Sequence, residues 1–167
     1  IIKGKISIDD TQLQFDNTLY FNINTPSKIN VLAISDSNAD YLNRIFTDDE
    51  FNYTYTKPNA LDYSLFDAQN LVIINEIVVL PISLTTALKA FSDKGGAVVF
   101  IPSDQGNLKD YNTFLQRFNT TPFNPILTTQ KRITTINYSH PLYANGVFEK
   151  RVDNFQYPKV ERYFPQN

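Results

Sequence analysis

Three uninterrupted apolar runs constrain the fold of this chain most. They read "INVLAIS" (29–35), "NLVIIN" (70–75) and "AVVFI" (97–101). A strand with one solvated face alternates apolar and polar residues, whereas a strand covered on both faces is apolar throughout. The runs therefore predict three buried strands of a mostly parallel sheet.

The segments between these runs have the apolar spacing of helices. Ser37, Ser83 and Asn107 are each predicted to begin a helix, because their side-chain oxygens can accept backbone N–H bonds. Gly95-Gly96 is expected to end the second helix. That helix has an apolar face made of Leu84, Ala87, Leu88 and Phe91.

The order of these elements indicates the fold class. The alternating segment 51–56 predicts a more exposed strand, and 133–136 and 160–164 are strand-like pieces near the end. Strands alternating with helices are typical of an α/β fold with helices on both faces of a parallel sheet. We expect a three-layer sandwich with a flavodoxin-like, mostly parallel sheet.

Residues 1–27 differ from residues 28–167 in their hydrophobic pattern. Short period-two runs between Asp and Asn turns predict antiparallel strands in 5–24, followed by a linker at 25–27. This β arm is either the tail of an upstream β domain or an edge hairpin on the α/β domain, 28–167. The chain contains no Met, which suggests a piece of a longer protein.

Composition excludes several classes of function. The chain has no cysteine, so it has neither disulfides nor a thiolate nucleophile, and its single histidine excludes a multi-histidine metal site. A net charge of -2 gives no electrostatic basis for nucleic-acid binding. No apolar run approaches the roughly 20 residues that span a bilayer, so membrane attachment would use segments outside this chain.

Polar residues follow the predicted buried strands, and parallel sheets bind ligands at that edge. The candidate cleft consists of Asp36, Ser37, Asn75, Glu76, Ser103, Asp104 and His140. Each member also has a structural interpretation as a helix cap, strand end or turn. Together, Asp36 and Glu76 could hold Mg²⁺, and Ser103 with His140 could form a residual hydrolase site. The G-x-S-x-G and G-x-G-x-x-G motifs are absent.

The segments 70–75 and 84–104, "NLVIIN" and "LTTALKAFSDKGGAVVFIPSD", resemble the core of the class I glutamine amidotransferase-like superfamily. Within it, the chain is most similar to membrane-anchored Bacteroidetes proteins of the BatA-like type. That similarity lies in "FDNTLYFNIN" (15–24), "KINVLAISD" (28–36) and "HPLYANGVF" (140–148).

The resemblance implies an amidotransferase-like frame without its nucleophile. Active members place a cysteine after the strand that 97–101 resembles, whereas here Ser103 stands in that region and His140 lies in a His-Pro segment. It implies a non-catalytic interaction or scaffold module without a cofactor, from a membrane-anchored protein whose soluble portion is periplasmic. Its partner would be another protein or a neighbouring domain. The alternative is a domain that binds a small molecule or Mg²⁺, or a residual hydrolase.

Overall fold

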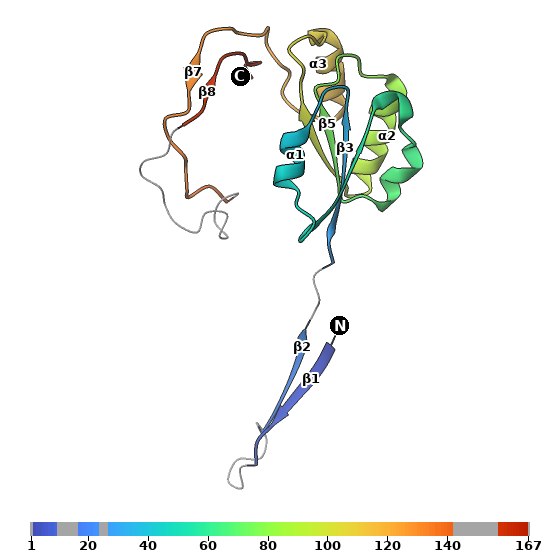
Figure 1. The fold of residues 1–167 in the computed structure, drawn as a ribbon, viewed down its shortest axis with the longest axis vertical. Coiled ribbons are helices and arrows are strands. Elements are labelled where there is room, and N and C mark those ends of the chain that lie inside the picture. Colours follow the sequence, from blue (N-terminus) through green and yellow to red (C-terminus); the bar gives the residue numbers. More distant parts are fainter. Residues whose placement is uncertain (1, 10–16, 24–26, 142–156, 167) are drawn as a thin grey trace.

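The computed structural model describes residues 2–9, 17–23, 27–141 and 157–166. Its centre is a parallel sheet of four strands in the order β4-β3-β5-β6 (Figure 1). The strands are β3 (Ile29–Ser35), β4 (Phe51–Thr56), β5 (Leu71–Asn75) and β6 (Ala97–Ile101). This is a flavodoxin-like order, and the direction of winding reverses between β3 and β5.

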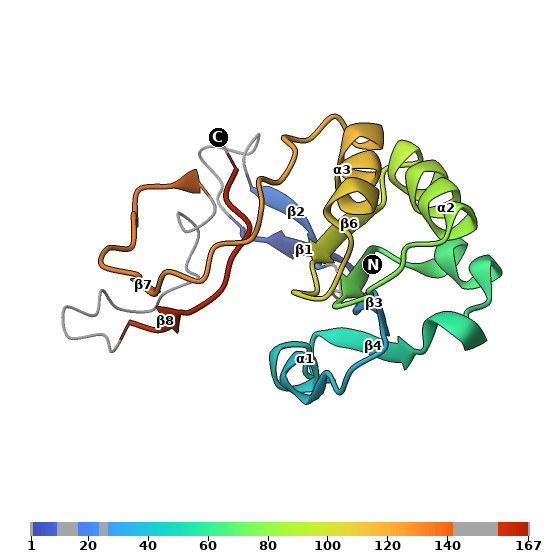
Figure 2. The same cartoon turned by 90° about the horizontal axis from the view of Figure 1, so that it is seen from above.

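Helices cover both faces of the sheet, as the apolar runs predict. Figure 2 shows α1 (Asp40–Ile45) on one side, and α2 (Ile82–Asp93) with α3 (Leu108–Arg117) on the other. Alternate residues of β3 and β5 supply the two cores. The α1 side buries Val31, Ala33, Ala39, Leu42 and Ile73. The side of α2 and α3 buries Leu32, Ile34, Val72, Ile74, Leu84, Leu88, Phe91, Phe114 and Leu115, among others. The predicted α/β sandwich is confirmed.

The strand β6 is less buried than its apolar run predicts. It is the edge strand, and Val99 is 42% exposed. Val98 and Phe100 pack against the core on the side of α2 and α3. On the opposite face, α1 has six residues and packs over β3 and β5. That face of β6 is therefore open at Val99, whereas Ile101 packs against the core on the α1 side.

Two of the three predicted helix starts are wrong. The first helix begins at Asp40 with Ala39 at its cap position, and the second begins at Ile82 after Pro81. Ser83 lies inside the second helix, where its hydroxyl is 3.0 Å from the Tyr63 hydroxyl. The third start is confirmed, because Asn107 Oδ1 accepts bonds from the backbone of Lys109 and Asp110.

The predicted glycine stop is also confirmed. Gly95 has a φ of 96°, in the left-handed region that glycine adopts without strain. Its N–H donates to the Ser92 carbonyl, and that of Gly96 donates to the Phe91 carbonyl. The chain thereby leaves α2 and enters β6 within three residues.

The segment after α3 returns to the β6 edge with little regular structure. Its strands are β7 (Lys131–Arg132) and β8 (Lys159–Val160), which pair in antiparallel fashion. The predicted strand at 133–136 is not formed, and a single bridge joins Leu127 to Tyr163. Phe123 and Phe164 stack at 5.1 Å, and Phe123 also lies beside Phe100 of β6. Aromatic packing, more than strand pairing, attaches this segment to the domain.

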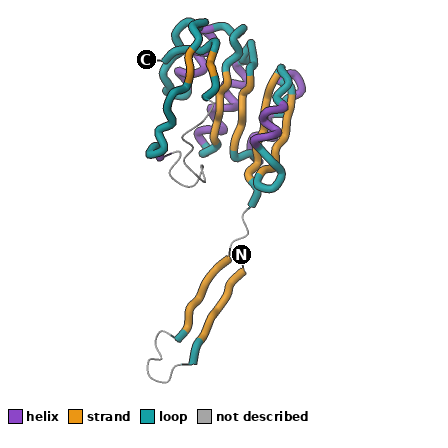
Figure 3. The backbone as a smooth tube through the Cα atoms, turned by 60° about the vertical axis from the view of Figure 1, so that its left-hand side comes forward, coloured by secondary structure: helices purple, strands orange, loops and turns teal. Residues whose placement is uncertain are grey.

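The N-terminal arm is a two-stranded antiparallel hairpin of β1 (Ile2–Ser7) and β2 (Thr18–Ile23). Figures 1 and 3 show it projecting away from the parallel sheet. The antiparallel strands of the prediction are confirmed for these residues. The linker prediction at 25–27 falls largely outside the described residues, as does most of the "HPLYANGVF" segment.

The hairpin has two chemically different faces, set by its register. Ile2 is paired with Ile23, and Ile6 with Leu19, so these side chains share one face. We name this the apolar hairpin face: Ile2, Ile6, Ile8, Leu19, Phe21 and Ile23. The opposite, polar hairpin face consists of Lys3, Lys5, Ser7, Thr18, Tyr20 and Asn22. Among the described residues, no helix is long and apolar enough to cross a membrane.

Candidate functional site

The carboxyl ends of β3 and β5 bring together a polar cluster at the point where the winding reverses. Ser35 and Asn75 end these strands in register with each other, and both are fully buried. Asn75 Nδ2 donates to Ser35 Oγ over 2.9 Å. Ser35 Oγ in turn donates to the Ser37 carbonyl, 3.1 Å away. The buried polar atoms therefore have partners, as burial requires.

Two tyrosines complete this cluster from neighbouring elements. The hydroxyl of Tyr41, on α1, donates to Asn75 Oδ1. The hydroxyl of Tyr55, on β4, donates to the Ser35 carbonyl over 3.1 Å. Partial burial, and secondly the charge of Glu76, raise the pKa of Tyr41. Tyr41 is therefore a neutral donor at neutral pH.

Ser37 and Glu76 form the contact that the sequence predicted only as a shared cleft. Ser37 Oγ donates to Glu76 Oε2 over 2.7 Å, which replaces its predicted role as a helix cap. At the start of α1 it is Asn38 whose side chain bonds to the backbone, because its Oδ1 accepts the Asp40 N–H over 3.1 Å. Glu76 has a φ of 51°, and its N–H donates to the Ile101 carbonyl over 2.8 Å. The left-handed turn thus links β5 to the end of β6.

Asp36 is exposed and lines a cleft of about 400 Å³ beside this cluster. The cleft lies at the carboxyl ends of β3 and β4 and carries charges of both signs. Its lining is Asp36, Ser37, Asn38, Ala39, Asp40, Asn43, Tyr53, Tyr55 and Lys57. Burial, and then the nearby tyrosines Tyr41 and Tyr55, raise the pKa of Tyr53. The wall therefore offers the phenol groups of two tyrosines together with an ammonium and two carboxylates.

The described residues contain no group of three or more His, Asp or Glu side chains placed to hold a metal ion. Asp36 and Glu76, the predicted Mg²⁺ ligands, have different surroundings. Asp36 lines the cleft, whereas the Glu76 carboxylate accepts the Ser37 hydroxyl. The geometry gives Glu76 a structural partner.

The loop after β6 is held by hydrogen bonds of its own. Tyr111 is fully buried, and its hydroxyl donates to the Ile77 carbonyl over 2.7 Å while accepting the Ser103 N–H over 3.1 Å. A Cβ on Gly106 would lie 1.9 Å from that hydroxyl oxygen, so only glycine fits there. Burial above all raises the pKa of Tyr111. The phenol therefore remains protonated and fixes the elbow region.

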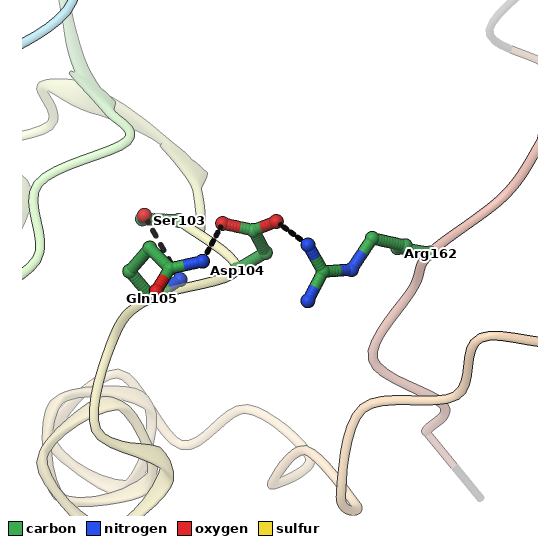
Figure 4. A network of polar contacts seen from close by, with 4 residues as sticks. All are labelled: Ser103, Asp104, Gln105 and Arg162. Atoms are coloured by element: carbon green, nitrogen blue, oxygen red, sulfur yellow. Dashed lines mark hydrogen bonds and ion pairs between the residues drawn. The ribbon is translucent and has the colours of Figure 1, made fainter.

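Ser103 and Asp104 are also engaged within this loop (Figure 4). Ser103 Oγ accepts the Gln105 N–H over 3.2 Å. Asp104 accepts the Gln105 side-chain amide over 3.0 Å and pairs with Arg162 of the C-terminal segment. The pair is about half exposed, so it orients the segment more than it stabilises it.

His140 lies in a turn of the C-terminal segment, where its N–H donates to the Asn137 carbonyl over 3.1 Å. In the part of the chain that the structure describes, the hydrogen bond of the Ser103 hydroxyl is with Gln105 and not with His140. A serine nucleophile needs a base within hydrogen-bond reach. The described geometry does not supply that pair.

Residues of these networks that escaped prediction as site residues include Ser35, Tyr41, Tyr55, Tyr111 and Arg162. Ser35 could have been found from the sequence, since it is a polar residue at the end of a largely apolar strand. Asn75 holds the same position at the end of the neighbouring strand. Tyr111 and Arg162 contact residues 34 and 58 positions away in the chain, and no local pattern shows this.

Comparison of the chain with protein-family models, curated proteins and solved structures gives no match.

Proposed function

We propose that this chain is a non-catalytic interaction module that docks through the apolar hairpin face. One observation carries the proposal: the six side chains of that face are between 36% and 62% exposed. They lie side by side on one pleated surface because of the register of β1 and β2. A contiguous apolar surface of this kind is typical of an interaction site.

The strand-end residues support the non-catalytic part of the proposal. Ser37, Asn75 and Glu76 are bonded to one another or to Ser35, and Ser103 and Asp104 are bonded within their loop. These contacts fix backbone geometry. A catalytic constellation would instead place a nucleophile against a base and leave both open to a substrate.

Site-specific photo-cross-linking tests the docking role. Leu19 and Tyr20 are neighbours in β2 on opposite hairpin faces. A benzophenone amino acid at position 19 of the full-length protein is expected to form covalent protein adducts in the producing cell. The same group at position 20 is the matched control and should form far fewer. Equal adducts from both positions, or none from either, would contradict the proposal.

A second candidate function is the binding of a small polar molecule, and the cleft of about 400 Å³ favours it. Such a cleft falls within the usual size range of ligand sites and lies at the edge where parallel sheets bind ligands. Thermal unfolding with Mg²⁺, glutamine and nucleotides tests it. A ligand at a hundred times its dissociation constant adds about 2.7 kcal/mol of stability. A shift with glutamine or a nucleotide should disappear in Lys57→Ala, and a shift with Mg²⁺ should disappear in Asp36→Ala. Either shift should persist in Lys28→Ala, whereas no shift with any probe removes these ligands as candidates.

We also propose, on the family resemblance, that membrane segments outside this chain hold the domain in the periplasm. Fractionation of the full-length protein tests this location. Retention in the membrane pellet after a high-salt wash, with digestion by protease added to spheroplasts, is the expected result. Recovery in the soluble fraction would contradict the anchoring.

A further inference from the structure

We infer that the partner of the apolar hairpin face is the same face of a second copy of this chain. Two hairpins would pack face to face as a small four-stranded sandwich. This inference rests on the proposed docking role and assigns its occupant.

The hairpin needs a covering layer that its own domain does not provide. A two-stranded hairpin is marginal in water, and it becomes stable when a further layer covers its apolar face. The hairpin projects away from the parallel sheet in Figures 1 and 3. Leu19 and Ile2 are each 62% exposed, and Ile6 is 55% exposed. The projection also lets two hairpins approach without collision of the two α/β domains.

The area of the face suits a dimer of moderate affinity. Six side chains exposed to this extent present roughly 500 Å² of apolar surface. Two such faces in contact would bury about 1,000 Å², which is near the lower limit for a specific interface. We therefore expect a reversible dimer with a dissociation constant in the micromolar range.

The charge distribution permits this contact between identical surfaces. The apolar hairpin face carries no charged side chain, whereas Lys3 and Lys5 both lie on the opposite face. In a face-to-face pair these lysines point outward into solvent. The net charge of -2 on each chain adds little repulsion.

The arrangement of side chains on the face is compatible with a two-fold axis. The Phe21 ring covers Gly4 at its centre, where a Cβ would meet ring atoms at 2.2 to 2.7 Å. Aliphatic cross-strand pairs flank the ring, Ile2 with Ile23 at one end and Ile6 with Leu19 at the other. A two-fold rotation therefore sets aliphatic ends against aliphatic ends and ring against ring. Pairing through the strand edges would leave this face in water.

Sedimentation equilibrium of the full 167-residue chain, from about 1 to 200 µM, tests the inference. The wild type is expected to shift from 19.2 kDa toward twice that mass as concentration rises. The double variant Ile6→Thr with Leu19→Thr places β-branched residues at both positions of a cross-strand pair but removes apolar surface. Its dimer should be at least about tenfold weaker.

The matched control alters the neighbouring cross-strand pair on the polar hairpin face, Lys5→Thr with Tyr20→Thr. Its dimerisation should equal that of the wild type. The urea midpoint of both variants should also equal that of the wild type, because the hairpin contributes no residue to either core of the α/β domain. This second measurement separates loss of docking from loss of folding.

A wild type that stays monomeric to 200 µM would overturn the second-copy inference, as would dimerisation that Ile6→Thr with Leu19→Thr leaves unchanged. Binding of the monomer to anionic phospholipid vesicles, lost in the same variant, would overturn it in favour of a lipid surface. Adducts from position 19 to a different protein would leave the docking role standing and remove the second copy as occupant. Absence of adducts from both positions 19 and 20 would remove the docking role itself.

Discussion

Asn75 and Ser35 face each other across adjacent parallel strands, and the Asn75 amide donates to the Ser35 hydroxyl over 2.9 Å. The same amide accepts from Tyr41, so one buried side chain joins β5 to β3 and to α1. Because both strand ends are fully buried, water cannot replace these bonds without rearrangement.

Replacement of this amide should destabilise the α/β domain. Asn75→Ala removes the acceptor of the Tyr41 hydroxyl and one of the bonds of the buried Ser35 hydroxyl, which costs about 1–3 kcal/mol. Urea unfolding followed by far-UV circular dichroism measures the loss. Asn43→Ala, at an exposed position on α1, is the control and should change stability by less than about 0.5 kcal/mol. Equal effects of the two changes would show that the buried cluster is not structural.

Removal of the Tyr111 hydroxyl should loosen the loop after β6. Tyr111→Phe keeps the ring in its fully buried site but leaves the Ile77 carbonyl and the Ser103 N–H unpaired. The expected cost is about 1–3 kcal/mol, with faster hydrogen exchange at the Ser103 amide. Tyr20→Phe, at a ring that is 73% exposed, should leave both quantities unchanged. Unaltered exchange at Ser103 in Tyr111→Phe would refute the bridging role.

The left-handed backbone at Glu76 predicts an unusual ranking of two small substitutions. Both Glu76→Ala and Glu76→Gly remove the carboxylate that Ser37 contacts, but alanine keeps the strain of a φ of 51°. The glycine variant should therefore be more stable by about 0.5–1 kcal/mol, measured by urea unfolding. At Asp36, whose φ is not positive, alanine should be at least as stable as glycine. The opposite ranking at Glu76 would be inconsistent with this backbone conformation.

The titration of Tyr41 should report on its neighbours. Its folded-state pKa is raised, chiefly by burial and then by Glu76, whereas the unfolded chain has the ordinary value of 10.0. The folded state therefore holds its proton more tightly, and stability from this group is complete below pH 10 and is lost as the pH rises above it. Tyr41→Phe should be less sensitive to alkaline unfolding than the wild type.

The difference in phenolate absorbance between wild type and Tyr41→Phe isolates this titration from those of the other tyrosines. Glu76→Gln should move it to lower pH, because the like-charge repulsion disappears. If Glu76→Gln left the titration of Tyr41 unchanged, an electrostatic contribution of Glu76 to the Tyr41 pKa would be excluded.

The fold class could be predicted from the sequence because it depends on burial. Apolar runs at 29–35 and 70–75 predict strands covered on both faces, and the structure confirms this for β3 and β5. The run at 97–101 has the same composition, yet β6 lies at an edge. Strand order decides that difference, and order depends on crossovers that local composition does not encode.

The helix starts show where local reasoning fails. Asn107 caps α3 because the backbone N–H groups of Lys109 and Asp110 lie within reach of its side-chain oxygen. The Ser37 hydroxyl instead donates to Glu76, and the Ser83 hydroxyl is hydrogen-bonded to Tyr63. Both partners lie far away in the sequence. In the candidate site, too, contacts between residues distant in the sequence were harder to predict than local ones. The meeting of Ser37 with Glu76 was predictable from strand ends, whereas Tyr111 and Arg162 required the tertiary structure.

The hairpin register has a consequence for how this molecule tolerates change. The side chains of the apolar hairpin face belong to neither core cluster of the α/β domain. Under the docking role proposed above, substitutions there would change the partner and its affinity, while the thermal midpoint of the domain stays the same. Assembly and foldability would then be encoded in separate stretches of one polypeptide, and each could diverge without loss of the other.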